Sequence, residues 1–164
     1  MFLLKMNDDG EILWKHTTRL STYQYLRDIA LSPDGTITAI GDIYRPSYDG
    51  GTARESAFVI QLSSEGALSF EREYNLGKEK FLLKALRPVQ DGMQLYGTGC
   101  AGDGTEGACH MLILDDHGDI IAKAEQALWA ECNYYSAIIK EDAYGRIHVF
   151  AQNNTYLESI NEFN

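Results

Sequence analysis

The sequence predicts an all-β fold, and three observations lead to that prediction. Apolar runs rich in Ile, Val, Phe and Tyr recur along the 164 residues, and each run is too short for a stable helix. Turn sequences that end in Asp-Gly or Glu-Gly bound these runs, and glycine supplies the positive φ that tight turns need. The residues beside the turns alternate between apolar and polar, as half-buried strands do.

The turn glycines form two interleaved series. In the first series Gly10, Gly66 and Gly118 lie 56 and 52 residues apart, and in the second Gly35, Gly92 and Gly145 lie 57 and 53 residues apart. A shared period of about 54 residues that holds four short strands is typical of a β-propeller blade. We therefore expect an all-β propeller built of four-stranded antiparallel blades.

The positions of the repeats predict how the chain is divided. Residues 1–20 are expected to be the third and fourth strands of a preceding blade, residues 21–74 blade 1, residues 75–127 blade 2, and residues 128–164 blade 3 without its last strand. Within blade 1 the strands are expected at about residues 26–31, 36–42, 57–62 and 67–74. The chain then forms one partial propeller domain of about three blades. We expect it to be part of a longer propeller, or half of one that a twofold partner completes.

Composition excludes several classes of partner. The chain has 14 Lys and Arg against 24 Asp and Glu, a net charge of −10, which argues against non-specific binding to nucleic acid or to anionic membranes. No run approaches the roughly 18 apolar residues that span a membrane. The first six residues lack the features of a signal peptide. The scattered carboxylates favour solubility and protect sheet edges.

The long connections indicate which face would bind a ligand. In a four-stranded blade the short turns lie on one face, and the longer loops between the second and third strands lie on the other, together with the connections between blades. Rigid strands position such loops for binding. The candidate ligand-binding residues there are Tyr44, Arg45, Tyr48, Asp49, Asp103, Glu106, Trp129 and Glu131. The alternative is structural, since Tyr and Trp at blade junctions can pack between sheets with their polar tips in water.

The cysteines leave two alternatives open. Cys100 and Cys109 bracket one long loop and could form a disulfide across its ends in an oxidising compartment. Two free thiols are the other alternative. Cys132 would have no partner in either case.

Motifs for catalysis and for cofactors are missing from the sequence. Residues 7–11 and 115–119 resemble fragments of calcium loops but lack the EF-hand spacing. The four histidines have no metal-ligand spacing, and neither a phosphate-binding loop nor a nucleophile elbow occurs. We predict no cofactor, no metal and no set of catalytic residues.

Residues 2–14, FLLKMNDDGEILW, resemble a bacterial β-propeller repeat in which a strand ending in Asp-Gly-Gly-Tyr-Ile precedes Asp-Val-Tyr-Leu-Ile-Lys-Thr-Asp-x-x-Gly-Asn-x-x-Trp. Residues 34–41 and 91–97 resemble the other half of that repeat. The resemblance implies a propeller fold with mainly structural repeats, and a secreted, periplasmic or cell-surface location, although this chain shows no signal peptide. The chain departs from the pattern where Trp14 is followed by Phe70 and then by Ala122.

Two function hypotheses follow. The first is a non-catalytic binding or interaction scaffold that takes a glycan or a protein on the long-loop face. It would act as a homo-oligomer or with the remainder of a longer propeller, without nucleic acid and without membrane insertion. The alternative is a propeller enzyme, such as a carbohydrate hydrolase or lyase, that uses loop carboxylates.

Overall fold

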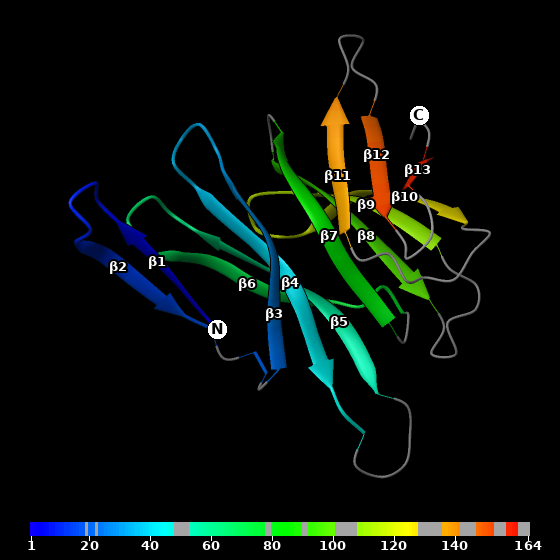
Figure 1. Cartoon of the computed structure of the whole chain (residues 1–164), viewed down its shortest axis with the longest axis horizontal. Coiled ribbons are helices and arrows are strands. Elements are labelled where there is room, and N and C mark those ends of the chain that lie inside the picture. Colours follow the sequence, from blue (N-terminus) through cyan, green and yellow to red (C-terminus); the bar gives the residue numbers. More distant parts are fainter. Residues whose placement is uncertain are drawn as a thin grey trace.

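The computed structural model describes residues 1–18, 20–21, 23–47, 53–77, 80–89, 92–100, 108–127, 136–141, 147–152 and 157–160. Among these residues all regular structure is β-strand (Figure 1). The strands are β1 Phe2–Met6, β2 Ile12–Thr17, β3 Tyr23–Leu31, β4 Ile37–Arg45, β5 Arg54–Leu62, β6 Leu68–Tyr74, β7 Lys80–Val89, β8 Gly92–Cys100, β9 Ala108–Leu114, β10 Ile120–Ala127, β11 Ser136–Glu141, β12 Ile147–Gln152 and β13 Leu157–Ile160. The described part of the chain has no helix long and apolar enough to cross a membrane. The all-β class is confirmed.

The strands form consecutive antiparallel units. β1 and β2 make a separate hairpin, which we call the first hairpin. The strands β3 to β6 pair in chain order as meander 1, and β7 to β10 pair in the same way as meander 2. One parallel bridge between Glu55 and Lys80 connects the two meanders. β11, β12 and β13 form a further antiparallel sheet, and β7 contacts both β3 and β11 (Figure 1).

Four of the turns adopt one geometry. Gly10, Gly35, Gly66 and Gly118 have φ values of 84°, 86°, 83° and 80°, so the predicted positive φ is confirmed at each. In each turn the glycine N–H donates to the carbonyl three residues earlier, for example from Gly10 to Asn7 at 3.0 Å. Asn7 N–H donates in turn to the Glu11 carbonyl at 3.0 Å. Gly145 lies outside the described residues.

The sequence repeat is also a repeat in strand register. The hairpins β1–β2, β5–β6 and β9–β10 each contain a bulge directly after the turn. The pairs that close the three ladders are Met6 with Ile12, Leu62 with Leu68, and Leu114 with Ile120. Each pair is related to the next by the 56- and 52-residue spacings of the turn glycines, so the three hairpins share one backbone design.

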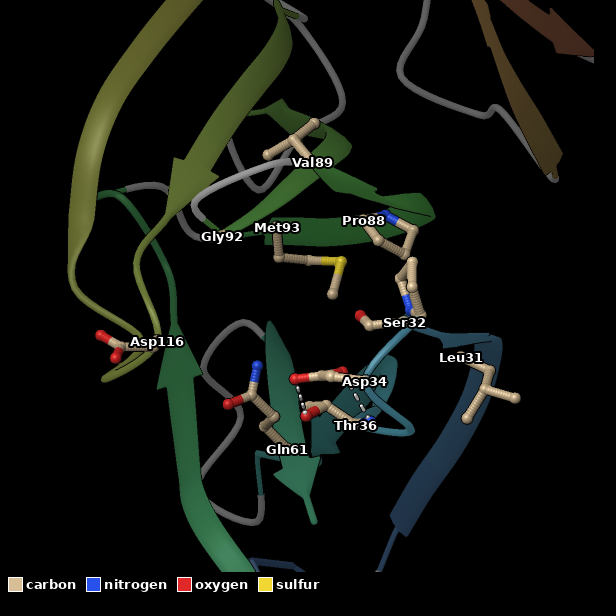
Figure 2. A pocket seen from close by; sticks show the side chains of 11 residues that line it. Leu31, Ser32, Asp34, Thr36, Gln61, Pro88, Val89, Gly92, Met93 and Asp116 are labelled. Atoms are coloured by element: carbon tan, nitrogen blue, oxygen red, sulfur yellow. Dashed lines mark hydrogen bonds between the residues drawn. The ribbon is translucent and has the colours of Figure 1, made fainter. Parts of the chain in front are cut away.

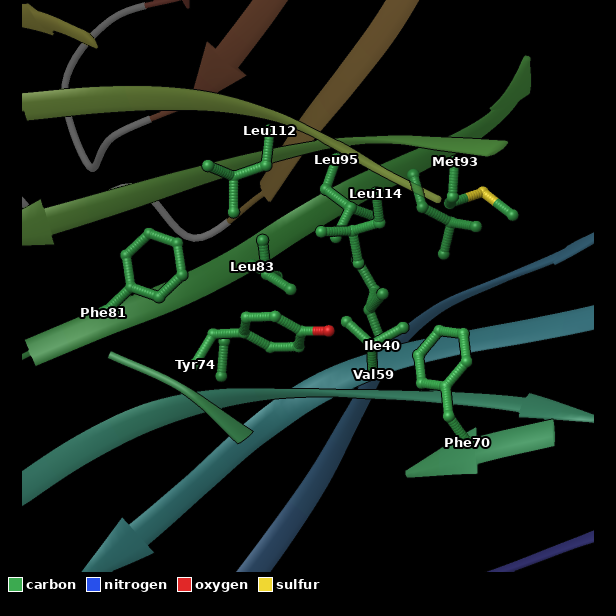
Figure 3. Packing of buried hydrophobic residues seen from close by; sticks show 12 residues of the cluster. Ile40, Val59, Phe70, Tyr74, Phe81, Leu83, Met93, Leu95, Leu112 and Leu114 are labelled. Atoms are coloured by element: carbon green, nitrogen blue, oxygen red, sulfur yellow. The ribbon is translucent and has the colours of Figure 1, made fainter. Parts of the chain in front are cut away.

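The main core lies between the two meanders (Figure 3). Meander 1 contributes Ile40, Ala57, Val59, Phe70 and Tyr74, and meander 2 contributes Phe81, Leu83, Leu86, Met93, Leu95, Leu112 and Leu114. A second core lies on the other face of meander 1, where Phe58, Ile60 and Leu62 pack with Leu3 of the first hairpin. Because alternate residues of a strand point to opposite faces, burial of β5 from Ser56 to Leu62 covers both of its faces, and the run from Ala57 to Ile60 is continuously apolar.

One contact joins successive units in the same way twice. The Trp14 ring lies over Gly66, where an added Cβ would be 2.6 Å from the indole, and Trp14 Nε1 donates to the Ser64 carbonyl at 3.1 Å. The Phe70 ring lies over Gly118, where an added Cβ would be 2.7 Å from it. The residue at the third equivalent position is Ala122, which is exposed. The aromatic residues four positions after Gly10 and after Gly66 therefore each pack one unit onto the turn of the next.

Candidate functional site

The candidate site lies on β3, β4 and β5 of meander 1 beside β7, at the end of the strands opposite to the Gly35 turn. β3 contains a bulge between Leu26 and Asp28, and β7 contains one between Leu83 and Ala85. The extra residues are Arg27 and Lys84, which are 57 residues apart and therefore equivalent in the repeat. A bulge turns the side chain of its extra residue out of the regular alternation. Each meander thus has a cationic residue at the bulge of its first strand, at equivalent positions of the repeat.

Asp42 of β4 is the buried centre of this site. Only 3% of the residue is exposed. Its Oδ2 accepts a short hydrogen bond from Arg27 Nε in an ion pair, while its Oδ1 has no hydrogen-bond partner among the described residues. Since a buried polar atom without a partner costs free energy, a hydroxyl or N–H group that donates to Asp42 Oδ1 would stabilise the site.

A cavity of about 240 Å³ lies against Asp42. Tyr25, Arg27, Tyr44 and Glu55 complete its lining. Strand pairing explains this grouping: Tyr25 is the cross-strand partner of Asp42, and Tyr44 is the partner of Glu55, so all four side chains leave one face of meander 1. We call this cavity the Asp42 pocket.

Charge in the Asp42 pocket is nearly balanced. Lys80 Nζ lies 3.0 Å from Glu55 Oε2, and the Asp42 carboxylate interacts electrostatically with Lys84. Burial raises the pKa of Asp42, although Lys84 and Arg27 oppose that shift. Burial likewise lowers the pKa of Lys84, against the effect of the Asp42 carboxylate. Both ionised groups therefore carry a desolvation cost that their mutual attraction offsets only in part.

A second cavity, of about 460 Å³, shares Glu55 with the Asp42 pocket. Here Arg45 makes a two-fold ion pair with Glu73, in which Arg45 Nη2 lies 2.7 Å from Oε2, and Arg45 Nη1 donates to Ser56 Oγ at 3.1 Å. The hydrogen bond from Arg45 lowers the pKa of Glu73. The guanidinium of Arg45 is thus already engaged within the protein.

A third cavity, of about 980 Å³, lies at the opposite end of the strands (Figure 2). The turn that includes Asp34 borders it on one side, and Pro88 and Met93 border it on the other. Asp34 Oδ1 accepts from Thr36 N–H at 2.9 Å, and Oδ2 accepts from Thr36 Oγ1 at 2.9 Å. Its carboxylate is satisfied locally, so this cavity offers a weaker site than the Asp42 pocket despite its size.

The structure places two of the eight predicted ligand residues. Tyr44 lines the Asp42 pocket, where its ring meets that of Tyr23 edge-to-face at 6.1 Å between centroids, and Arg45 lines the neighbouring cavity. The other six, Tyr48, Asp49, Asp103, Glu106, Trp129 and Glu131, lie outside the described residues.

The side chains of Cys100 and Cys109 also lie outside the described part of the structure. The backbone register pairs Cys109 with Thr98, two residues before Cys100. The disulfide and the two free thiols therefore both stay predictions.

The acidic turns have a structural explanation. Asn7 Oδ1 accepts from the N–H groups of Asp9 and Glu11, and Asp115 Oδ1 accepts from those of His117 and Asp119. These oxygens stabilise the turns from inside. Among the described residues no group of three or more His, Cys, Asp or Glu side chains is arranged to hold a metal ion.

Sequence reasoning missed Arg27, Asp42 and Lys84. Two signals were available for them. Asp42 interrupts the apolar stretch from Ile37 to Ile43, and Arg27 and Lys84 occupy equivalent places in the two repeats. Neither signal reveals a bulge, and without the bulges the three charges cannot be placed together.

Comparison with known proteins gives no further assignment. A scan against protein-family models finds no match, and neither does a search among curated proteins.

Proposed function

We propose that the chain is a β-propeller repeat protein that serves as a non-catalytic binding scaffold, and that it takes a glycan in the Asp42 pocket. The observation that carries the proposal is the buried carboxylate oxygen of Asp42, which lines a cavity and lacks a hydrogen-bond partner among the described residues. Binding sites combine a concave surface with a few such oriented polar groups.

The propeller assignment is supported by the repeated units. The two meanders have the same strand order, the same bulges and the same aromatic-on-glycine lock. Their first strands, β3 and β7, contact each other, and β7 contacts β11 in turn (Figure 1). In propellers the first strands of successive blades surround the central channel. The Asp42 pocket would then open at the inner end of blade 1.

A neutral polyol fits the charges of the pocket better than an ion does. Arg27, Lys80 and Lys84 face Asp42 and Glu55, so both carboxylates already have cationic partners and one positive charge is in excess. A cationic ligand would compete with these lysines and with Arg27, and an anion would meet the two carboxylates. A sugar hydroxyl can donate to Asp42 Oδ1 without adding charge, and tyrosine rings offer surfaces on which sugar rings pack.

Glycan-array screening followed by calorimetry tests the proposal. Asp42→Asn keeps the volume but weakens the acceptor, so the affinity for any glycan identified should fall by about tenfold or more. Tyr25→Ala should also weaken binding, since this ring is half-exposed beside the pocket. Asp116→Asn, at an exposed turn, serves as the matched control. Unchanged affinity in Asp42→Asn would rule the pocket out, and Tyr48→Ala and Trp129→Ala would then test the predicted loops.

One observation favours the second candidate, an enzyme that hydrolyses or cleaves carbohydrate. Asp42 and Glu55 line the same pocket, and burial raises the pKa of Asp42, as it does in many general acids. Both carboxylates are nevertheless in ion pairs, with Arg27 and with Lys80, which suits binding better than proton transfer. Release of reducing ends from a bound glycan, abolished in Glu55→Gln, would establish the enzyme.

A further inference from the structure

The outer face of the first hairpin is apolar and uncovered. Phe2, Leu4 and Met6 alternate along β1 on the side away from meander 1, with exposed fractions of 57%, 39% and 51%. Leu3, between them, is buried against meander 1. Three large apolar side chains in one row on a two-stranded hairpin form a contiguous patch, which a soluble protein exposes where a partner binds.

The residues equivalent to this face in the next repeat are buried. Moving by 56 residues takes Phe2, Leu4 and Met6 to Phe58, Ile60 and Leu62. These three side chains are completely buried, in the core that meander 1 shares with the first hairpin. The outer face of β1 therefore has the apolar composition of the equivalent face of β5, and that face of β5 is buried.

The turn of the first hairpin is uncovered as well. Gly66 carries the Trp14 ring and Gly118 carries the Phe70 ring, whereas the nearest atom to an added Cβ at Gly10 is Cε of its own Met6, at 3.8 Å. In the described part of the chain, Gly10 is thus the turn of this series without an aromatic ring from another unit.

On the turn and outer face of the first hairpin, charge is divided between the two ends. Lys5, the cation beside the turn, is directed to meander 1, where its Nζ donates to the Ser64 carbonyl at 3.1 Å. Asp8, Asp9 and Glu11 make the turn acidic, and Lys15 lies toward the other end, with its Nζ 4.8 Å from the Phe2 ring centroid. Two such hairpins packed face to face in opposite directions bring each acidic turn close to the other copy's Lys15. Packed in the same direction, they would place the two acidic turns together, which is unfavourable.

We propose that a second copy of this chain covers the face, through an isologous twofold interface in which the β1–β2 hairpins of the two copies pack in opposite directions. In this interface Phe2, Leu4 and Met6 of one protomer meet the same side chains of its partner, and the acidic turn of each lies beside Lys15 of the other. A twofold axis requires a patch of this kind, self-complementary in both shape and charge. The proposal is independent of the glycan pocket, which lies on other strands.

Sedimentation equilibrium of the full chain tests the proposal. Wild-type protein should form dimers that dissociate on dilution, and Leu4→Glu should raise the dimer dissociation constant by about tenfold or more. Leu31→Glu is the matched control, because Leu31 is also an exposed leucine, but on β3. A chain that stays monomeric at every concentration would overturn the proposal and leave a different repeat-bearing chain as the occupant of this face.

A charge swap tests the geometry without touching the apolar row. The variant Asp8→Lys/Asp9→Lys and the variant Lys15→Glu should each dimerise several-fold more weakly than wild type. When the two variants are mixed, dimerisation should recover. In the mixed dimer the new lysines of one variant meet the new glutamate of the other, and the unaltered Lys15 meets the unaltered acidic turn. Weaker dimerisation of each variant alone, followed by recovery in the mixture, supports the opposed twofold arrangement. Undiminished dimerisation of either variant alone, or failure of the mixture to recover, overturns it.

Discussion

Polar side chains at the two ends of the same strands differ in whether they find hydrogen-bond partners close by in the chain. At the turn end, Asn7, Ser63 and Asp115 each accept hydrogen bonds from two backbone N–H groups of their own turn. Asp34 accepts one from the backbone N–H of Thr36 and one from the Thr36 hydroxyl. At the other end, Asp42 and Lys84 are buried together between sheets, and one oxygen of Asp42 has no partner within the described residues. The turn end satisfies its polar groups with local hydrogen bonds. The other end leaves one buried oxygen without a partner among the described residues, and this is where we propose that a ligand binds.

This difference has an energetic meaning. Local hydrogen bonds at the turns stabilise the backbone conformation that closes each hairpin. Buried charges that attract each other only partly offset their desolvation, so the Asp42 and Lys84 pair need not stabilise the fold. Substitutions at the turn end should therefore destabilise the fold, and removal of both charges at the other end should not.

The largest effect is expected at the turn glycines beneath aromatic rings. In Gly118→Ala the new Cβ would lie 2.7 Å from the Phe70 ring at a φ of +80°, so left-handed backbone strain and overpacking should together lower the free energy of unfolding by about 2 to 4 kcal/mol. Gly77→Ala is the matched control, since Gly77 has a φ of +72° but no atom near an added Cβ. It should cost about 1 to 2 kcal/mol. Urea denaturation gives both values, and equal losses would show that the ring contact adds nothing.

The second-largest effect on stability is expected from substitution of the buried charges Asp42 and Lys84. Asp42→Asn alone leaves Lys84 buried without its carboxylate, and should lower the free energy of unfolding by about 1 to 3 kcal/mol. Adding Lys84→Met removes the second buried charge, so the double variant should return to about the wild-type value or exceed it. Thermal and urea unfolding of the three proteins provide the test. A double variant less stable than Asp42→Asn would mean that the pair stabilises the fold and need not be kept for binding.

The all-β class and the antiparallel hairpins were predictable from local signals, and the site was not. Positive-φ glycines, alternating strands and a 56-residue spacing are visible in the sequence, and the structure has strands where they predict them, with β3 beginning at Tyr23 and β4 reaching Arg45. The Asp42 pocket depends on two bulges and on the contact between β3 and β7, which no local pattern encodes. Equivalence of Arg27 and Lys84 in the repeat is the one clue that a sequence reader could have used.

A smaller effect is expected from the buried hydroxyl between the meanders. Tyr74 Oη donates to the Gly118 carbonyl at 2.7 Å, so Tyr74→Phe should cost about 1 kcal/mol near neutral pH. Burial raises the pKa of Tyr74 from 10.0 to about 12, so the folded state holds the neutral phenol. The unfolded state gains by ionising above pH 10, and the wild-type advantage over Tyr74→Phe should shrink between pH 10 and about 12. A difference that stays constant across that range would contradict the buried, neutral phenol.

The smallest effect is expected at the exposed turn of the first hairpin. Asn7 Oδ1 accepts from Asp9 N–H at 3.1 Å and from Glu11 N–H at 2.8 Å, and in Asn7→Ala water replaces that acceptor, so the loss should be about 0.5 kcal/mol. Amide hydrogen exchange is more sensitive than denaturation here, because local opening is what changes. The Glu11 amide should exchange faster in Asn7→Ala and be unchanged in Asp8→Ala, whose side chain makes no hydrogen bond within the described structure. Unchanged exchange at Glu11 in both variants would mean that the backbone hydrogen bonds alone hold the turn. The difference between the turn end and the Asp42 pocket would then come from backbone hydrogen bonds in the turns and not from hydrogen bonds of side chains such as Asn7.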